Sequence, residues 1–175
     1  KCIILTGAAG SIGSFITRQL LREGARVMLT GRDQSKLDDF MGDLVAEGFE
    51  ETFMVSATGD CADPEVCRDI VAKTVAAFGP IDVLVNNAAM VRASKVIKTD
   101  VRVWEEHLKV NLTGAFLCSL KVLPGMINRG RGNIINVASV YGQQGESDLA
   151  AYCASKAGLI GFTRALAVEV GHHGV

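Results

Sequence analysis

The sequence lacks several features that would point at once to a class of protein. None of its 175 residues belong to an apolar run long enough to predict a membrane-spanning segment, and the first residues show no signal-peptide pattern. Lysine and arginine number 18 against 19 aspartates and glutamates, a balance that argues against a broad nucleic-acid-binding surface. We therefore expect a cytoplasmic protein that binds neither a membrane nor nucleic acid.

Residues that build disulfide frameworks and metal sites are few or poorly spaced. The five cysteines are scattered and contain no CxxC pair, which predicts free thiols in a reducing compartment. Of the three histidines, His107 stands alone while His172 and His173 are adjacent, so we expect no metal site. With 49% hydrophobic residues and only three prolines, the chain can bury the core of one domain.

What the sequence does contain is an alternation of two kinds of segment. Short aliphatic and β-branched runs predict strands at Cys2–Leu5, Ala25–Thr30, Thr52–Ser56, Ile81–Val85 and Asn133–Val137. Longer segments with helical spacing predict helices at Ser14–Arg22, Asp63–Phe78, Val101–Asn128 and Leu149–Val170. The strand runs are apolar throughout, which is typical of strands buried on both faces of a sheet. The pattern predicts an α/β fold of one domain, residues 1–175: a doubly wound parallel sheet (Rossmann fold) with helices on both faces.

The strongest local signal follows the first predicted strand, at the strand end where such sheets bind ligands. The segment Thr6–Gly13, TGAAGSIG, places three glycines between a strand and a helix. Glycines such as Gly7 permit a tight turn and a close approach to phosphate, and the first helical N–H groups, at Ser11, Ile12 and Gly13, face the same ligand. The segment predicts a dinucleotide-binding loop, although a glycine-rich turn without a ligand has the same composition.

The end of the second predicted strand bears on which dinucleotide binds. A carboxylate at this position usually accepts a hydrogen bond from the ribose 2′-hydroxyl of NAD. Here Gly31 stands about where that carboxylate would be, and Arg32 follows with a guanidinium suited to a 2′-phosphate. We predict that NADP(H) is preferred over NAD(H). The alternatives are that Arg32 is only a solvated surface residue and that Asp33 serves NAD.

The remaining motifs resemble those of the short-chain dehydrogenase/reductase family. They are, in chain order, Asp60–Asp63 (DCAD), Asn86–Ala89 (NNAA), Val110–Gly114 (VNLTG), Asn136–Ser139 (NVAS) and Tyr152–Lys156 (YCASK). The spacing from Ser139 to Tyr152 is that of the classical branch of the family. Each motif alone is common, but their occurrence in this order covers essentially the whole chain.

The resemblance implies an NAD(P)-dependent oxidoreductase that interconverts a secondary alcohol and a ketone. It implies four catalytic residues: Asn111, Ser139, Tyr152 and Lys156. It also implies that the cofactor is contacted, beyond the glycine-rich loop and Arg32, by Asp60, Cys61, Asn87, Ala88, Tyr152 and Lys156.

Elementary chemistry agrees with the catalytic set. Tyr152 and Lys156 are four residues apart and share one helix face, so the ammonium favours the phenolate. Tyr152 would then exchange a proton with the substrate oxygen, which Ser139 would hold by a hydrogen bond. Asn111 would help to hold a water for proton relay on the side of Lys156. Separately, each of these residues also has an ordinary structural explanation, such as a strand-end cap for Ser139.

Two departures from the family pattern keep other hypotheses open. Ser11 stands where the usual glycine motif has glycine, and the spacing of Gly7, Gly10 and Gly13 fits the extended branch. A nucleotide-sugar epimerase or dehydratase is therefore an alternative, as is a non-catalytic NADP-binding module. The resemblance also implies a further strand and a substrate lid after the helix of Lys156, which we expect this chain to lack.

The sequence also gives expectations about two binding partners: the substrate and further copies of the chain. Polar residues in Val140–Leu149 favour a small hydroxylated substrate, and the candidates are a sugar acid, a polyol or a 3-oxoacyl thioester. The helical segments Val101–Asn128 and Leu149–Val170 carry apolar residues on more than one face. We therefore expect a homodimer or homotetramer.

Overall fold

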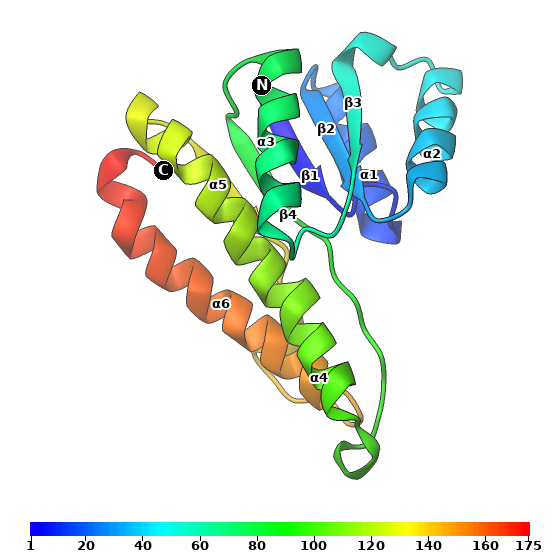
Figure 1. Cartoon of the computed structure of the whole chain (residues 1–175), viewed down its shortest axis with the longest axis vertical. Coiled ribbons are helices and arrows are strands. Elements are labelled where there is room, and N and C mark those ends of the chain that lie inside the picture. The colour runs from blue at the N-terminus through cyan, green and yellow to red at the C-terminus, as the bar shows by residue number, and fades with distance from the viewer.

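Five parallel strands form the centre of the structure, a computed structural model that describes all 175 residues (Figure 1). The strands are β1 (Cys2–Thr6), β2 (Arg26–Gly31), β3 (Met54–Thr58), β4 (Val83–Asn86) and β5 (Asn133–Asn136). They lie in the order β3-β2-β1-β4-β5, and each neighbouring pair is parallel. The helices are α1 (Ser11–Arg22), α2 (Gln34–Ala46), α3 (Pro64–Phe78), α4 (Val101–Leu108), α5 (Gly114–Arg129) and α6 (Ala150–Val170). The predicted doubly wound α/β fold is confirmed.

Helices cover both faces of the sheet, and each face has its own apolar core. On one face, Leu21 of α1 and Leu37 of α2 pack with Leu5 and Leu29 of the central strands. On the other face, α3 and α5 pack against the alternate residues of the same strands, such as Ile4. Strands buried on both sides explain the continuous apolar runs in the sequence.

Two expectations about individual elements need correction. α2 was not among the predicted helices, although Leu37, Phe40 and Leu44 bury one face of it at helical spacing. The expectation that every strand is buried on both faces is wrong for β5, where Ile135 is 48% exposed. β5 is the last strand on that side of the sheet within these 175 residues.

The longest helical segment joins α4 to α5 through a π-helical turn, Lys109–Thr113, and runs beside α6 (Figure 1). The segment Val101–Arg129 is long and apolar enough to cross a membrane by length and composition alone, whereas the sequence was expected to contain no such segment. Its most apolar window is 44% buried within the protein. Packing against α3, α6 and β4 is sufficient reason for that apolar composition.

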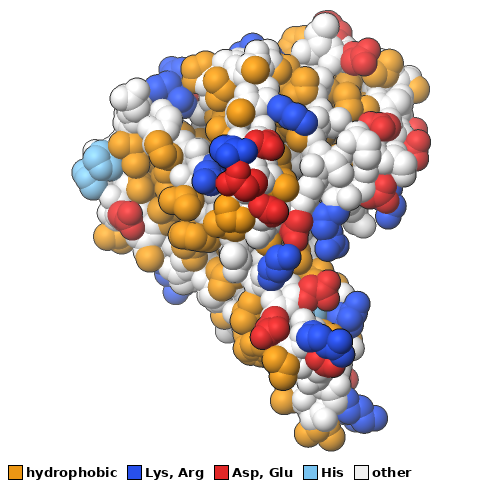
Figure 2. Space-filling model, viewed as in Figure 1, with side chains coloured by type: hydrophobic (Ala, Val, Ile, Leu, Met, Phe, Trp, Pro, Cys, Tyr) orange, Lys and Arg blue, Asp and Glu red, His pale blue; other side chains and the backbone are white.

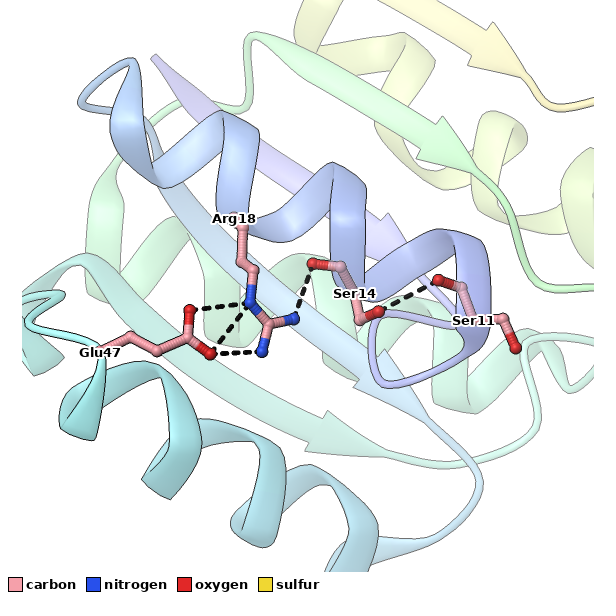
Figure 3. Close-up of polar contacts among 4 residues, drawn as sticks. All are labelled: Ser11, Ser14, Arg18 and Glu47. Carbon is pink, nitrogen blue, oxygen red and sulfur yellow. Dashed lines mark hydrogen bonds and ion pairs between the residues drawn. The ribbon is translucent and has the colours of Figure 1, made fainter.

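A polar clamp joins the two helices that frame the glycine-rich loop (Figure 3). Arg18 of α1 donates from Nε to both carboxylate oxygens of Glu47, at 3.0 and 2.8 Å, just after α2. The same guanidinium donates to the Ser14 carbonyl and lies over the Phe40 ring. The hydrogen bond from Arg18 also lowers the pKa of Glu47. The clamp fixes α1 relative to α2, and the N-termini of both helices border the cavity described next.

Candidate dinucleotide site and catalytic residues

A cavity of about 680 Å³ opens where β1, β2, β3 and β4 end. Among the residues that line it are those predicted to bind the cofactor: Gly7, Ser11, Ile12, Gly13, Arg32, Asp60, Cys61, Asn87 and Ala88. They come from four separate strand exits, which the parallel order brings to one edge of the sheet. Tyr152 and Lys156, also predicted to contact the cofactor, do not line this cavity.

The glycine-rich loop has the geometry of a phosphate cradle. Gly7 adopts φ +68°, and a Cβ there would lie 3.0 Å from the Ala88 Cα. A Cβ at Gly13 would lie 2.1 Å from the Gly7 carbonyl oxygen, so only glycine lets α1 begin so close to the loop. The first turn of α1 leaves N–H groups without helical acceptors beside the cavity. The loop therefore fits the pyrophosphate of a dinucleotide.

Hydrogen bonds hold this loop to the end of β4. The Thr6 hydroxyl accepts from the backbone N–H groups of Asn87 and Ala88, at 3.0 and 2.9 Å. Asn87 in turn donates from Nδ2 to the carbonyls of Thr6 and Gly7. The Asn87 side chain thus fixes the loop, which is a role the sequence did not reveal.

The end of β2 presents positive charge to the cavity. Arg32, Asp33 and Lys36 all line it, and the Asp33 carboxylate also caps α2, where its Oδ1 accepts from the Lys36 N–H and the Ser35 hydroxyl. The Lys36 backbone N–H is the main cause that lowers the pKa of Asp33. Sequence reasoning missed Lys36, although its place in the first turn after a strand exit was a usable signal. The two cations suit a phosphate, whereas Oδ2 of Asp33 has no partner in the structure and is available to a ribose hydroxyl.

The end of β3 contributes Asp60 and Cys61. Partial burial opposes ionisation of Asp60, but the Ala62 N–H and the Lys109 ammonium, 2.9 Å away, lower its pKa on balance. Lys109 belongs to the π-helical turn, so this ion pair fixes the start of α5 against the rim of the cavity. No group of three or more His, Cys, Asp or Glu side chains is arranged to hold a metal ion.

Lys156 is a buried ammonium on α6. It is 2% exposed, and its Nζ donates to the Val137 carbonyl at 2.7 Å and lies 5.9 Å from the centre of the Tyr152 ring. Burial lowers the pKa of Lys156 to about 8, so the ammonium is still the main form at neutral pH. The predicted proximity of Tyr152 and Lys156 is therefore present in the structure.

Ser139 is held against the same helix by a short turn, Val140–Gly142. Its hydroxyl accepts from the Tyr141 N–H at 3.2 Å, which leaves the hydroxyl proton free to donate. A Cβ at Gly142 would lie 2.8 Å from the backbone carbon of Lys156, so the turn packs directly on α6. Both Ser139 and Tyr152 are half-buried.

Asn111 lies in the π-helical turn, where the Gly114 N–H bonds to the Lys109 carbonyl five residues earlier. Its Nδ2 donates to the Met90 carbonyl and the Ser155 hydroxyl, and its Oδ1 accepts from the Met90 N–H. Because both amide protons are engaged, the side chain joins the loop after β4 to α6. Such turns are frequent at functional sites. The water-holding role of Asn111 remains a prediction.

Comparison with known proteins agrees with this geometry. The chain is 39% identical to nodulation protein G of Azospirillum brasilense and covers 70% of it. It is 36% identical to an acetoacetyl-CoA reductase of an Acinetobacter species, with 97% of this chain and 68% of that protein covered. A solved structure, gluconate 5-dehydrogenase from Burkholderia cenocepacia in complex with NADP and tartrate, matches with a TM-score of 0.89 and 29% identity over 98% of this chain and 66% of that one.

The curated relatives are longer than the chain, which spans between 63% and 74% of their length. The family model described as short chain dehydrogenase matches residues 1–175, the whole of the chain. The strand order, the glycine-rich loop and the YCASK segment on α6 all fit that assignment. The chain belongs to the short-chain dehydrogenase family.

Proposed function

We propose that the complete protein is an NADP(H)-dependent oxidoreductase that interconverts a secondary alcohol and a ketone. The observation that carries the proposal is the cavity at the strand ends, which is lined by the glycine-rich loop, by first-turn residues of α1 and by Arg32. The buried Lys156 beside Tyr152 supplies a proton-transfer pair on the neighbouring helix. We expect the protein to act in the cytoplasm as a single dinucleotide-binding domain.

The side chains divide the chemistry among them. The dinucleotide, when bound, supplies or accepts the hydride. Tyr152 donates a proton to the ketone oxygen during reduction, or removes it from the alcohol during oxidation. Ser139 holds the same oxygen by a hydrogen bond, and the Lys156 ammonium lies beside the Tyr152 ring. Asn111 fixes the loop after β4 to α6, which keeps the proton-transfer residues in place.

The substrate class follows from the loop after Ser139 and from the relatives. Gln143, Gln144 and Glu146 make that loop polar and are exposed, which favours a hydroxylated or carboxylated ketone. The names of two relatives, gluconate 5-dehydrogenase and acetoacetyl-CoA reductase, include a sugar acid and a 3-oxoacyl thioester. We propose a sugar acid, a polyol or a 3-oxoacyl thioester as substrate.

The experiment is an NADPH-oxidation assay of the complete protein over a panel of these ketones, read at the nicotinamide absorbance. Stoichiometric consumption of NADPH with one member of the panel supports the proposal. Tight nucleotide binding without turnover of any substrate would favour a non-catalytic binding module. Conversion of a nucleotide sugar without net NADPH consumption would favour an epimerase of the extended branch.

The cofactor preference is tested by two variants at the end of β2. We predict that Arg32→Ala weakens NADP(H) binding about ten- to hundred-fold and leaves NAD(H) nearly unchanged, because a charge-assisted contact to the 2′-phosphate contributes about 1.5–3 kcal/mol. Gly31→Asp should reverse the preference by adding a ribose acceptor that repels phosphate. An aspartate fits there, since a Cβ at Gly31 meets only Leu37, at 3.5 Å.

Calorimetric titration of both nucleotides against the complete protein measures these affinities. Arg22→Ala is the matched control, because Arg22 is also exposed but does not line the cavity. If the parent protein binds NAD(H) as tightly as NADP(H), or more tightly, Arg32 does not bind the 2′-phosphate.

We also propose that the protein assembles as a homodimer or homotetramer through α5 and α6. Figure 2 shows many hydrophobic side chains over these helices. On α5, Phe116 and Leu120 are nearly half exposed. The rings of Phe116 and Phe162 meet edge to face, with their centres 6.0 Å apart, and so join the two helices into one apolar surface. Light scattering of the complete protein at micromolar concentration should give the mass of a dimer or tetramer; a monomer would contradict the proposal.

A further inference from the structure

The segment that follows β4 is held in place by side chains rather than by other backbone groups. It leaves the sheet, runs to the N-terminal end of α4 and returns as that helix (Figure 1). From Asn87 to Ala93, no backbone N–H or carbonyl bonds to another backbone group. Ala88, Ala89 and Val91 of this segment nevertheless line the nucleotide cavity, so the position of the segment sets the shape of one wall.

His107 and Asn111 supply the hydrogen bonds in the outer part of this segment. Asn111 binds both the N–H and the carbonyl of Met90. His107 lies one turn earlier on α4, and its Nε2 accepts from the Arg92 N–H at 3.1 Å. The two side chains therefore hold the backbone on either side of Val91.

The imidazole of His107 is enclosed, and each of its nitrogens has a partner. The residue is 0% exposed, and its Nδ1 lies 2.7 Å from the Val103 carbonyl oxygen. A carbonyl oxygen only accepts and a backbone N–H only donates, so Nδ1 carries the proton and Nε2 is bare. The neutral Nδ1–H tautomer is thus the form that fits this site. A buried polar ring with both nitrogens satisfied makes specific contacts as well as filling space.

We propose that His107 is a positioning residue of the nucleotide site, whose Nε2 keeps Val91 in the cavity wall by holding the Arg92 N–H. The effect on binding rests on the proposed function. His107 does not itself line the cavity, so it acts through the backbone of the segment. Without this hydrogen bond the nucleotide would have to order the segment as it binds, which weakens affinity. Asn111 would still join the segment to α6, so the proton-transfer residues would stay in place.

Two substitutions separate the hydrogen-bond acceptor from the bulk of the ring. In His107→Gln the amide oxygen reaches the position of Nε2 and accepts from the Arg92 N–H, whereas in His107→Asn the shorter amide replaces only Nδ1. We expect His107→Asn to raise both the Kd and the KM for NADPH about three- to tenfold, which corresponds to the loss of one hydrogen bond. Its kcat should stay close to that of the parent protein, and His107→Gln should keep the parent affinity.

Calorimetric titration and steady-state NADPH oxidation of the complete protein measure these constants. His172→Asn is the matched control, because it makes the same substitution at an exposed histidine outside the cavity. If His107→Asn does not fold, His107→Leu takes its place, since leucine fills the space without an acceptor. Equal losses in the glutamine and asparagine variants, unchanged affinity in the variant without an acceptor, or a lower kcat with unchanged KM would each overturn the proposal.

A measurement without turnover tests the contact itself and separates it from the proposed function. In NMR spectra of the isotope-labelled complete protein, the His107 ring should show a protonated Nδ1 and a bare Nε2. The Arg92 amide should exchange slowly with solvent in the parent and in His107→Gln, and faster in His107→Asn. The opposite tautomer, or fast exchange of that amide in the parent, would overturn the proposal. Failure of the parent to bind NADPH would refute the proposed function instead, and these spectra would still decide whether His107 holds the segment.

Discussion

Replacement of Tyr152 by phenylalanine should lower kcat for the ketone that serves as substrate by about 10²- to 10⁴-fold, the usual contribution of a positioned acid or base. The variant keeps the ring that lies near the Lys156 ammonium and removes only the hydroxyl that exchanges the proton. Stopped-flow or steady-state NADPH oxidation measures the loss. Titration of the same variant with NADPH shows how far Tyr152 also supports nucleotide binding.

Tyr141→Phe is the matched control for this substitution, because Tyr141 is the one other tyrosine of the chain and is also half-buried. The coulombic effect of Glu146 is the main cause that raises the pKa of Tyr141, and a hydrogen bond with the same carboxyl adds to it, so its phenol is less suited to proton exchange. We expect Tyr141→Phe to keep kcat within about threefold of the parent value. Comparable losses in both variants would mean that the hydroxyl of Tyr152 has no special role.

Several residues that the sequence pointed to line one cavity because of the way a parallel sheet is arranged. Residues such as Gly7, Arg32 and Asp60 are far apart in the chain, but each follows a strand, and parallel strands bring their carboxyl ends to one edge. The relation of Tyr152 to Lys156 was equally accessible, since helical spacing alone places them on one face. Asp60, Tyr152 and Lys156 themselves were named by the resemblance to the short-chain dehydrogenase/reductase family, and periodicity only places them in space.

Other features depend on contacts between segments that no local pattern encodes. The hydrogen bonds that the Asn111 side-chain amide donates to Met90 and Ser155 depend on how the loop after β4 lies against α6. The capping of α2 by Asp33 depends on where that helix starts, and α2 itself was missed.

The cysteines show the same limit most clearly. Scattered cysteines without a CxxC pair correctly predicted free thiols, because all five are unpaired in the structure. Nothing in the sequence indicated that the sulfurs of Cys67 and Cys118 would lie 3.5 Å apart, since the contact requires α3 and α5 to pack side by side on one face of the sheet. Tertiary packing, not motif content, creates that contact.

Packing also predicts a large effect of a substitution at the start of α1, on both nucleotide binding and protein stability. Gly13→Ala should weaken nucleotide binding about 5- to 150-fold and lower the stability of the protein, because over-packing of a rigid site costs about 1–3 kcal/mol. The added Cβ would lie 2.1 Å from the Gly7 carbonyl oxygen and 2.9 Å from that of Ala8, and backbone atoms cannot move aside as a flexible side chain can. The helix must therefore shift away from the loop, which carries its free N–H groups away from the phosphates.

Gly42→Ala provides the control, because Gly42 lies inside α2 and a Cβ there meets no atom within 4 Å. Alanine should stabilise that helix by about 0.5–1 kcal/mol and leave nucleotide affinity unchanged. Thermal unfolding of both variants and of the parent, with and without NADPH, separates the two effects. Gly13→Ala should have a lower melting temperature and a smaller shift on addition of nucleotide, whereas Gly42→Ala should show a shift equal to that of the parent. A Gly13→Ala variant that binds NADPH as the parent does would mean that the close start of α1 is not what holds the pyrophosphate.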